Sequence, residues 1–221
     1  MNTDNTPNIN DKKFEAWFKN HYLKLILGFL FIFSGFPVIA PVLMRFGLFL
    51  PAKIIYWVYG FFCHQLPFRS WFLFGAQSYY PLARSGIVSV LSFESVFNLE
   101  SQDYESLRTI IGNSSAGYKI AICQRDIAMY FSLLVFGLFF AIKNRKIKSI
   151  PLWVWLIFGV MPLGLDGLTQ VLGNNHILFL GDYARESTPL LRTITGCLFG
   201  LFTGWYVFPT LEFLVNRSNL E

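Results

Sequence analysis

The chain has 221 residues, of which 54% are hydrophobic and 19% are aromatic. Only 14% are charged, against about 25% in soluble domains, so these residues cannot cover a soluble surface. The composition therefore predicts an integral membrane protein whose surface contacts membrane lipid. The net charge is +5, but the basic residues flank apolar runs, as in membrane proteins. Because no basic stripe is interleaved with aromatic residues, we expect no nucleic-acid partner.

Five apolar stretches determine the predicted fold. A spanning helix needs about 20 mostly apolar residues, and the stretches predict an all-α, polytopic transmembrane helix bundle of about five spans: residues 22–44, 51–65, 118–143, 151–173 and 189–215. The second stretch is short, which indicates a tilted or partly inserted helix. We predict a polar N-terminal tail at residues 1–21 and a single membrane domain at residues 22–221.

Residues 66–117, between the second and third predicted spans, have a different composition. They hold many of the acidic residues and alternate aromatic with small side chains. We expect an ordered extramembrane loop that caps one face of the bundle. Within it, Ser70 to Phe74 fit a strand or an interfacial segment. Residues 103–111 have helical spacing, and Gly112-Asn113 is a stop signal.

The basic residues bear on the orientation in the membrane. With five spans, the N-terminus and the capping loop share one face. Leaving the loop out, that face carries Lys12, Lys13, Lys19, Lys24 and Arg185, and the other carries Arg45, Lys53, Lys143, Arg145, Lys146, Lys148 and Arg217. Because basic residues concentrate on the cytoplasmic side, this count of five against seven slightly favours a cytoplasmic 143–148 loop.

Ionisable residues interrupt or adjoin the apolar stretches. A charge near the bilayer centre costs about 2.5–3.5 kcal/mol on insertion scales, so it persists mainly where it is paired or functional. Counting along the helices at about 1.5 Å per residue places these residues in the membrane half next to the capping loop, with Asp126 about 12 Å deep. We predict a polar pocket there, lined by Cys63, His64, Arg69, Arg125, Asp126, Asp166, Gln170, Glu186 and Arg192.

The last predicted span carries a ridge of small residues. Arg192 is followed at intervals of four by Gly196, Gly200 and Gly204. Such small-xxx-small ridges allow a neighbouring helix to approach closely. We therefore expect Arg192 to lie on a packed face of this helix.

Four motifs resemble a known family. They are Cys63-His64-Gln65-x-Pro67-x-Arg69-Ser70, Cys123-x-Arg125-Asp126, Asp166-Gly167-x-Thr169-Gln170 and Glu186-Ser187-Thr188-x3-Arg192-x2-Thr195-Gly196. Together they are similar to the prokaryotic integral membrane family catalogued as domain of unknown function 2085. The resemblance implies a helical protein of the prokaryotic cell membrane and no established reaction. The first two motifs are farther apart than in many members, which indicates a long-loop variant.

A metal site is one hypothesis for the pocket. Cys63, His64 and Cys123, together with Asp126, offer sulfur, nitrogen and oxygen ligands for Zn²⁺ or a similar divalent ion. Neighbours on a helix project about 100° apart, so Cys63 and His64 can both bind one ion only if the helix ends there. The alternatives are a disulfide between Cys63 and Cys123, or buried thiols.

An anion site is the second hypothesis. Arg69, Arg125 and Arg192, with Gln170, would bind the phosphate or carboxylate of an anionic lipid or small molecule. The carboxylates would then act as acid and base or hold Mg²⁺: Asp126, Asp166 and Glu186. Alternatively, the three arginines only neutralise the three acids, in a non-catalytic membrane subunit or scaffold. The sequence leaves open whether the chain is an enzyme and which proteins it binds.

Overall fold

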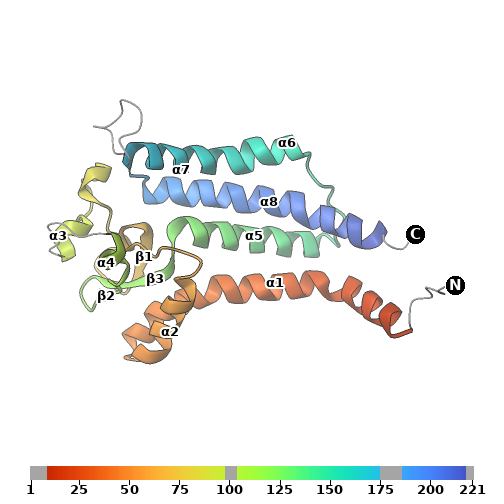
Figure 1. Ribbon diagram of the computed structural model, residues 1–221, viewed down its shortest axis with the longest axis horizontal. Helices are drawn as coiled ribbons and strands as arrows, with labels where there is room; N and C mark the ends of the chain where they lie inside the picture. Colours follow the sequence, from red (N-terminus) through yellow and green to blue (C-terminus); the bar gives the residue numbers. More distant parts are fainter. Residues whose placement is uncertain (1–8, 98–103, 175–185, 218–221) are drawn as a thin grey trace, which may run out of the picture.

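The structure is a computed structural model that describes residues 9–97, 104–174 and 186–217. Long helices run side by side, and a small sheet with several short helices covers one end of them (Figure 1). The first and last helices, α1 (Ile9–Arg45) and α8 (Pro189–Arg217), begin and end respectively toward the opposite end, where the link at residues 143–151 also lies (Figure 1); we call this the open end. The predicted helical architecture is confirmed, but the all-α prediction omitted the sheet.

Within the described residues, four helical segments are long and apolar enough to span a membrane. The first is α1 (Ile9–Arg45), which includes part of the predicted polar tail, whose residues 1–8 lie outside the described residues. The second is α5 (Gln124–Ile142), and the fourth is α8 (Pro189–Arg217). The third is a continuous segment made of three elements: α6 (Leu152–Val154), the π-helical turn η3 (Trp155–Val160) and α7 (Met161–Asn174).

The second predicted span is the short helix α2 (Phe49–Tyr59), which has 11 residues. It is about 16 Å long at 1.5 Å per residue, too short for a hydrocarbon core of about 30 Å. The count of five spans is therefore not confirmed. Helix α2 leaves the direction of the bundle (Figure 1) and buries Ala52, Tyr56 and Tyr59. Its other side exposes apolar side chains such as Ile54 and Trp57.

A three-stranded antiparallel sheet replaces the start of the third predicted span. Strand β3 (Gly117–Cys123) lies between β1 (Ser70–Leu73) and β2 (Gly112–Asn113). Residues 118–123 were therefore wrongly predicted as helix. Tyr-Lys-Ile-Ala-Ile-Cys contains β-branched and aromatic residues that favour strands, and β1 pairs with it over Ser70↔Cys123 and Phe72↔Lys119. Of the two alternatives for residues 70–74, a strand or an interfacial segment, the structure has the strand, at Ser70–Leu73.

The covering unit has its own apolar core. We call residues 66–97 and 104–122 the cap. Besides the sheet it contains η1 (Pro67–Arg69), η2 (Ala83–Ser85), α3 (Phe93–Phe97) and α4 (Tyr104–Arg108). Its buried apolar cluster consists of Leu66, Phe68, Phe72, Tyr80, Phe93, Leu107 and Ala116. The described residues of the predicted capping loop thus form an ordered structure, and the helix predicted at residues 103–111 is present over Tyr104–Arg108 as the shorter α4.

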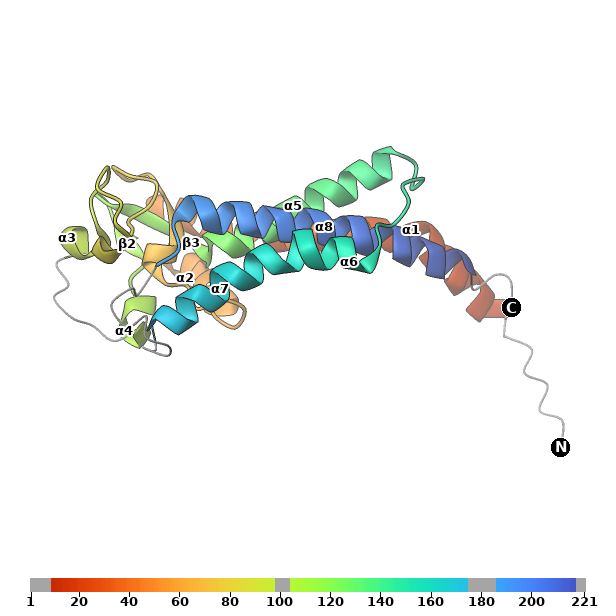
Figure 2. The same cartoon turned by 90° about the horizontal axis from the view of Figure 1, so that it is seen from above.

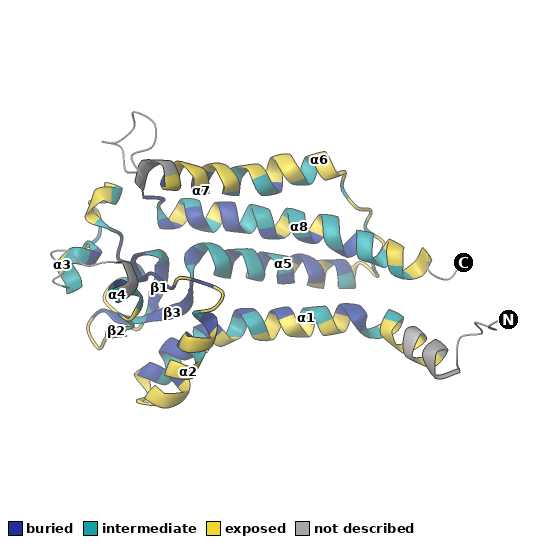
Figure 3. Ribbon diagram, in the orientation of Figure 1, coloured by how far each residue is buried: buried dark blue, intermediate teal, exposed yellow. Residues whose placement is uncertain are grey.

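Helices α5 and α8 pack through the predicted glycine ridge. A methyl group on Gly196 would overlap the carbonyl oxygen of Arg125, and one on Gly200 would overlap the side chain of Ser132. These close contacts confirm the ridge and bring the start of α8 against the start of α5. The view from above and the burial colouring show α8 lying among the other long helices, with the exposed residues on the outer faces (Figures 2 and 3).

Candidate functional site

All ten predicted site residues gather where the cap meets the bundle. Cys63 and His64 follow α2, Arg69 ends η1 and Cys123 ends β3. The rest lie at the cap-side ends of the long helices: Arg125 and Asp126 on α5, Asp166 and Gln170 on α7, and Glu186 and Arg192 at the start of α8. The convergence therefore brings together four separate stretches of the sequence: residues 63–69, 123–126, 166–170 and 186–192.

The position of Asp126 along its helix differs from the prediction. Asp126 was placed about two turns inside a helix starting near Tyr118, but α5 begins at Gln124. Asp126 is thus in the first turn of α5, at the level where the cap begins. There a carboxylate is favoured by the positive end of the helix dipole.

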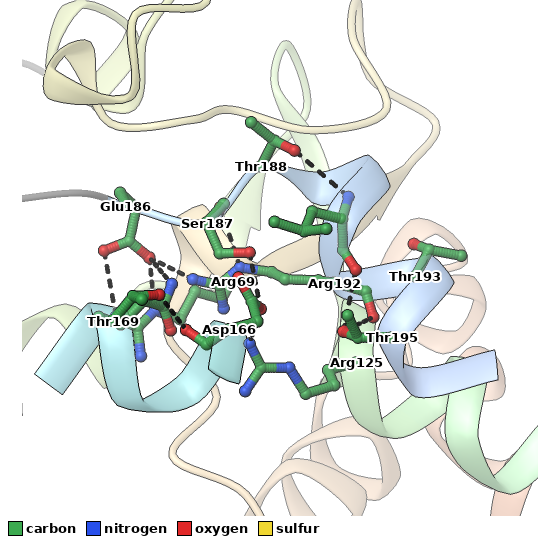
Figure 4. A network of polar contacts seen from close by, with 12 residues as sticks. Arg69, Arg125, Asp166, Thr169, Glu186, Ser187, Thr188, Arg192, Thr193 and Thr195 are labelled. Atoms are coloured by element: carbon green, nitrogen blue, oxygen red, sulfur yellow. Dashed lines mark hydrogen bonds and ion pairs between the residues drawn. The ribbon is translucent and has the colours of Figure 1, made fainter. Parts of the chain in front are cut away.

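The turn before α8 positions Glu186. Thr188 Oγ1 accepts a hydrogen bond of 3.2 Å from the Leu191 amide, and Pro189 is the first helical residue. This is a common start for a helix, because the threonine satisfies a free amide and proline needs none. The preceding Glu186 and Ser187 are held over the ends of α5 and α7 (Figure 4).

Glu186 is the acceptor for three arginines. Its side chain is buried, and Arg69 binds it bidentately, with Nε at 2.9 Å from Oε1 and Nη2 at 3.1 Å from Oε2. Arg192 contacts Oε1 through Nη2, and Arg84 lies 3.5 Å from Oε2. Arg192 Nε also donates to the Ser187 carbonyl oxygen at 3.1 Å. Figure 4 shows this network around Glu186.

A second ion pair joins α5 to α7. Arg125 Nη2 contacts Asp166 Oδ2, which also accepts a hydrogen bond of 2.9 Å from Ser187 Oγ. With its amide oriented to satisfy its neighbours, the Gln170 oxygen accepts from the Ser187 amide at 2.7 Å and from Arg192 Nη2 at 2.6 Å. Ser187 and Gln170 therefore connect the two ion-pair groups into one network.

A pocket of about 250 Å³ opens beside this network. Eight of the ten predicted residues line it: Cys63, His64, Arg69, Cys123, Arg125, Asp126, Gln170 and Arg192. Asp166 and Glu186 are not part of its wall, because they lie behind the arginines that they bind. Asp126 is thus the carboxylate of the predicted set that faces the pocket.

Two thiols and a carboxylate meet at the pocket wall. Sulfur atoms of Cys63 and Cys123 and a carboxylate oxygen of Asp126 all lie within 4.8 Å of one another. Both cysteines are free thiols. Their mutual hydrogen bond raises the pKa of Cys63, as does its burial, and lowers the pKa of Cys123. The metal hypothesis required the helix to end before Cys63 and His64, and α2 does end at Tyr59. His64 is nevertheless exposed and lies outside this three-residue group.

The sequence analysis missed Lys119. Its side chain is 0% exposed, and Nζ donates to the carbonyl oxygens of Gln65 at 2.7 Å and Arg108 at 2.8 Å. Burial lowers the pKa of Lys119 to about 7. The sequence signal was a single lysine in an otherwise apolar stretch, but this stretch was predicted as part of the spanning helix at residues 118–143, and the lysine was not considered separately. Gln65, beside the pocket, adopts a left-handed backbone with φ of 52°, and Lys119 binds its carbonyl group.

Comparison with known proteins identifies the family that the chain resembles. The model of a family described as a predicted membrane protein, domain of unknown function 2085, matches residues 105–206. The resemblance is confirmed. The matched region contains three of the four motifs, from Cys123 to Gly196, whereas the Cys63 motif precedes it.

A relative extends over most of the chain. The uncharacterised protein MJ1492 of Methanocaldococcus jannaschii is 26% identical over 207 residues, which are 90% of this chain and 98% of the relative. No solved structure matches the chain. The family and the four apolar helices establish that this is a membrane protein.

Proposed function

We propose that this membrane protein binds an anionic group, a phosphate or a carboxylate, in the pocket between the cap and the bundle. The single observation that carries the proposal is the set of three guanidinium groups on the pocket wall. Arg69, Arg125 and Arg192 come from three separate segments and share one pocket of about 250 Å³. Arginine presents five N–H donors in a planar fork that matches the oxygens of such groups.

The buried acids support the proposal, because they orient the arginines without filling the pocket. Glu186 binds Arg69 and Arg192, and Asp166 binds Arg125. Each guanidinium has further N–H groups beyond these bonds. In this proposal Glu186 and Asp166 are positioning residues, and Asp126 is the carboxylate of the predicted set that lines the pocket.

The place of the pocket favours a ligand at the membrane surface. It lies at the cap-side ends of the spanning helices, and Phe62 on its wall is 62% exposed. Exposed aromatic residues, including Phe61 and Trp57, continue from there onto α2. Aromatic side chains concentrate at the headgroup level of membranes. An anionic lipid headgroup and a free anion share the chemistry that the arginines would recognise.

The test compares two arginines that bind the same carboxylate. Arg69 lines the pocket, whereas Arg84 contacts Glu186 without lining it. The purified protein, in nanodiscs of zwitterionic lipid, is titrated calorimetrically with inorganic phosphate, dioctanoyl phosphatidic acid and dioctanoyl phosphatidylcholine. We expect Arg69→Gln to weaken anion binding at least about tenfold, since a charged hydrogen bond contributes about 1.5–3 kcal/mol. Arg84→Gln should bind as the native protein does.

The ligand series separates the two sources of the anion. Binding of both phosphate and phosphatidic acid indicates recognition of the phosphate group itself, and binding of the lipid alone indicates a headgroup site. If neither anion binds better than phosphatidylcholine, the proposal fails. The alternative is then a non-catalytic membrane subunit or scaffold, in which the ion pairs only stabilise the junction of cap and bundle.

A further inference from the structure

Cys63, Cys123 and Asp126 form a compact group of potential metal ligands. Each contributes one ligand atom, and the three atoms lie within 4.8 Å of one another. The residues come from three different segments: the chain after α2, the end of β3 and the first turn of α5. The pairing of Ser70 with Cys123 in the sheet fixes one of them. Cys123 and Asp126 lie close together where β3 passes directly into α5, and Cys63 joins them from a distant part of the sequence.

The distances are close to those that zinc requires. Zinc bonds are about 2.3 Å to sulfur and 2.0–2.2 Å to oxygen, so ligand atoms around a tetrahedral ion lie roughly 3.3–3.8 Å apart. Side-chain movements of about 1 Å would bring the three atoms to that arrangement. We propose that Cys63, Cys123 and Asp126 bind a thiophilic divalent cation of the zinc class on the wall of the pocket.

The ligand types decide the class of metal. Two thiolates favour zinc over magnesium or calcium, which prefer oxygen ligands. A site with three protein ligands leaves the fourth tetrahedral position open, which is typical of catalytic zinc. Cys63, Cys123 and Asp126 all line the pocket, so the open position would be reached from it. His64 also lines the pocket but lies outside the group.

The surrounding charges suit a bound cation with anionic ligands. Two thiolates and a carboxylate around a divalent ion leave one net negative charge. Arg69, Arg125 and Arg192 on the same pocket wall carry one more charge than Glu186 and Asp166, the two acids that they bind, and this excess positive charge compensates it. The metal site does not depend on the proposed anion binding, because its ligands are the protein's own side chains.

The experiment measures metal without any added anion. The full chain is purified in detergent under reducing conditions, and its zinc is measured by elemental analysis and replaced by cobalt. We expect one metal per chain and, with cobalt, thiolate charge-transfer absorption and the visible bands of a tetrahedral site. Cys63→Ser and Cys123→Ser should each remove part of the charge-transfer band. Asp126→Asn should weaken metal affinity by more than the roughly 10–100-fold that outer-shell changes cost.

Two variants serve as controls. Cys197 is also a free thiol but lies on α8, outside the group, so Cys197→Ser should retain the metal and its spectrum. His64→Ala should also retain the metal, since the open position does not need the imidazole. Loss of metal in His64→Ala would overturn the open position. Absence of stoichiometric metal in the reduced native protein, or a disulfide between Cys63 and Cys123 that reforms while zinc is present, would overturn the site. Anion binding is measured separately, so either result leaves that proposal to its own test.

Discussion

Arg192 and Glu186 form an ion pair in which each side chain is only 3% exposed. Arg84 contacts the same carboxylate at 3.5 Å, but its side chain is 39% exposed. Removing one partner of a buried pair leaves a charge without compensation and costs about 3–5 kcal/mol. An exposed pair contributes about 0–1 kcal/mol. The two arginines therefore differ in their contribution to stability although they share one acceptor.

The first prediction compares these two arginines. Arg192→Ala should lower the free energy of unfolding by about 3–5 kcal/mol, and Arg84→Ala by less than about 1 kcal/mol. Equilibrium unfolding in detergent measures both. Equal losses in the two variants would contradict the burial-based assignment of stability to Arg192.

The second prediction concerns the contact between α5 and α8. A Cβ on Gly200 would overlap Ser132 and the carbonyl oxygen of Met129, whereas one on Gly35 in α1 would meet nothing within 4 Å. Gly200→Ala should therefore destabilise the protein by about 1–3 kcal/mol through overpacking, measured by thermal unfolding in detergent. Gly35→Ala is the matched control and should leave the midpoint temperature of thermal unfolding unchanged or raise it. A neutral Gly200→Ala would mean that the two helices can separate without loss.

The sequence predicted the gathering of charges because each signal is local. An ionisable residue in an apolar stretch is costly wherever it lies, and counting along a helix gives its depth. The glycine ridge after Arg192 was likewise visible at intervals of four residues. The partners were not predictable, because three arginines can pair with three acids in many ways. In the structure, Glu186 forms ion pairs with Arg69, Arg84 and Arg192, and Asp166 forms an ion pair with Arg125.

The strand at residues 118–123 could not be separated from the helix that follows it. An apolar run of this length fits a buried strand as well as a buried helix. Only its pairing with β1, about fifty residues earlier in the chain, decides between them. The length of α2 could not be predicted for a similar reason, because the apolar run continues through Phe61 and Phe62 after the helix ends at Tyr59.

The third prediction is the orientation in the membrane. Because α2 is too short to span, the start of α1 lies with the end of α8 and the 143–148 loop at the open end, which changes the earlier count of basic residues. That end now carries nine: Lys12, Lys13, Lys19, Lys24, Lys143, Arg145, Lys146, Lys148 and Arg217. The cap side, with the cap itself again left out, carries three: Arg45 at the end of α1, Lys53 on α2, and Arg185 between α7 and α8. The positive-inside rule then predicts a cytoplasmic open end and a cap outside the cell.

Cysteine labelling tests this orientation. Val88 in the cap is 97% exposed, and Lys146 in the 143–148 loop is also exposed. A membrane-impermeant maleimide should label Val88→Cys in intact cells, and Lys146→Cys only after lysis, above the background of the native chain. The reverse pattern would place the cap in the cytoplasm.

The fourth prediction follows from the buried Lys119. Its pKa is lowered to about 7 by burial in the folded protein, against about 10.4 in an unfolded chain. Between these pH values the unfolded chain binds more protons, so stability should rise with pH, by at most about 1.4 kcal/mol per pH unit. Below about pH 7 the lysine is protonated in both states and contributes no further pH dependence. Equilibrium unfolding in detergent between pH 7 and 10 measures the slope.

Lys119→Met isolates this contribution, because methionine keeps an unbranched side chain and cannot be protonated. The variant should lose the rise in stability with pH, whatever its stability at pH 7 after losing the hydrogen bonds to Gln65 and Arg108. Lys53→Met is the matched control, since Lys53 is exposed on α2, and it should retain the native slope. An unchanged slope in Lys119→Met would show that another group titrates. The cap would then hold Lys119 charged between the two carbonyl groups over this whole range.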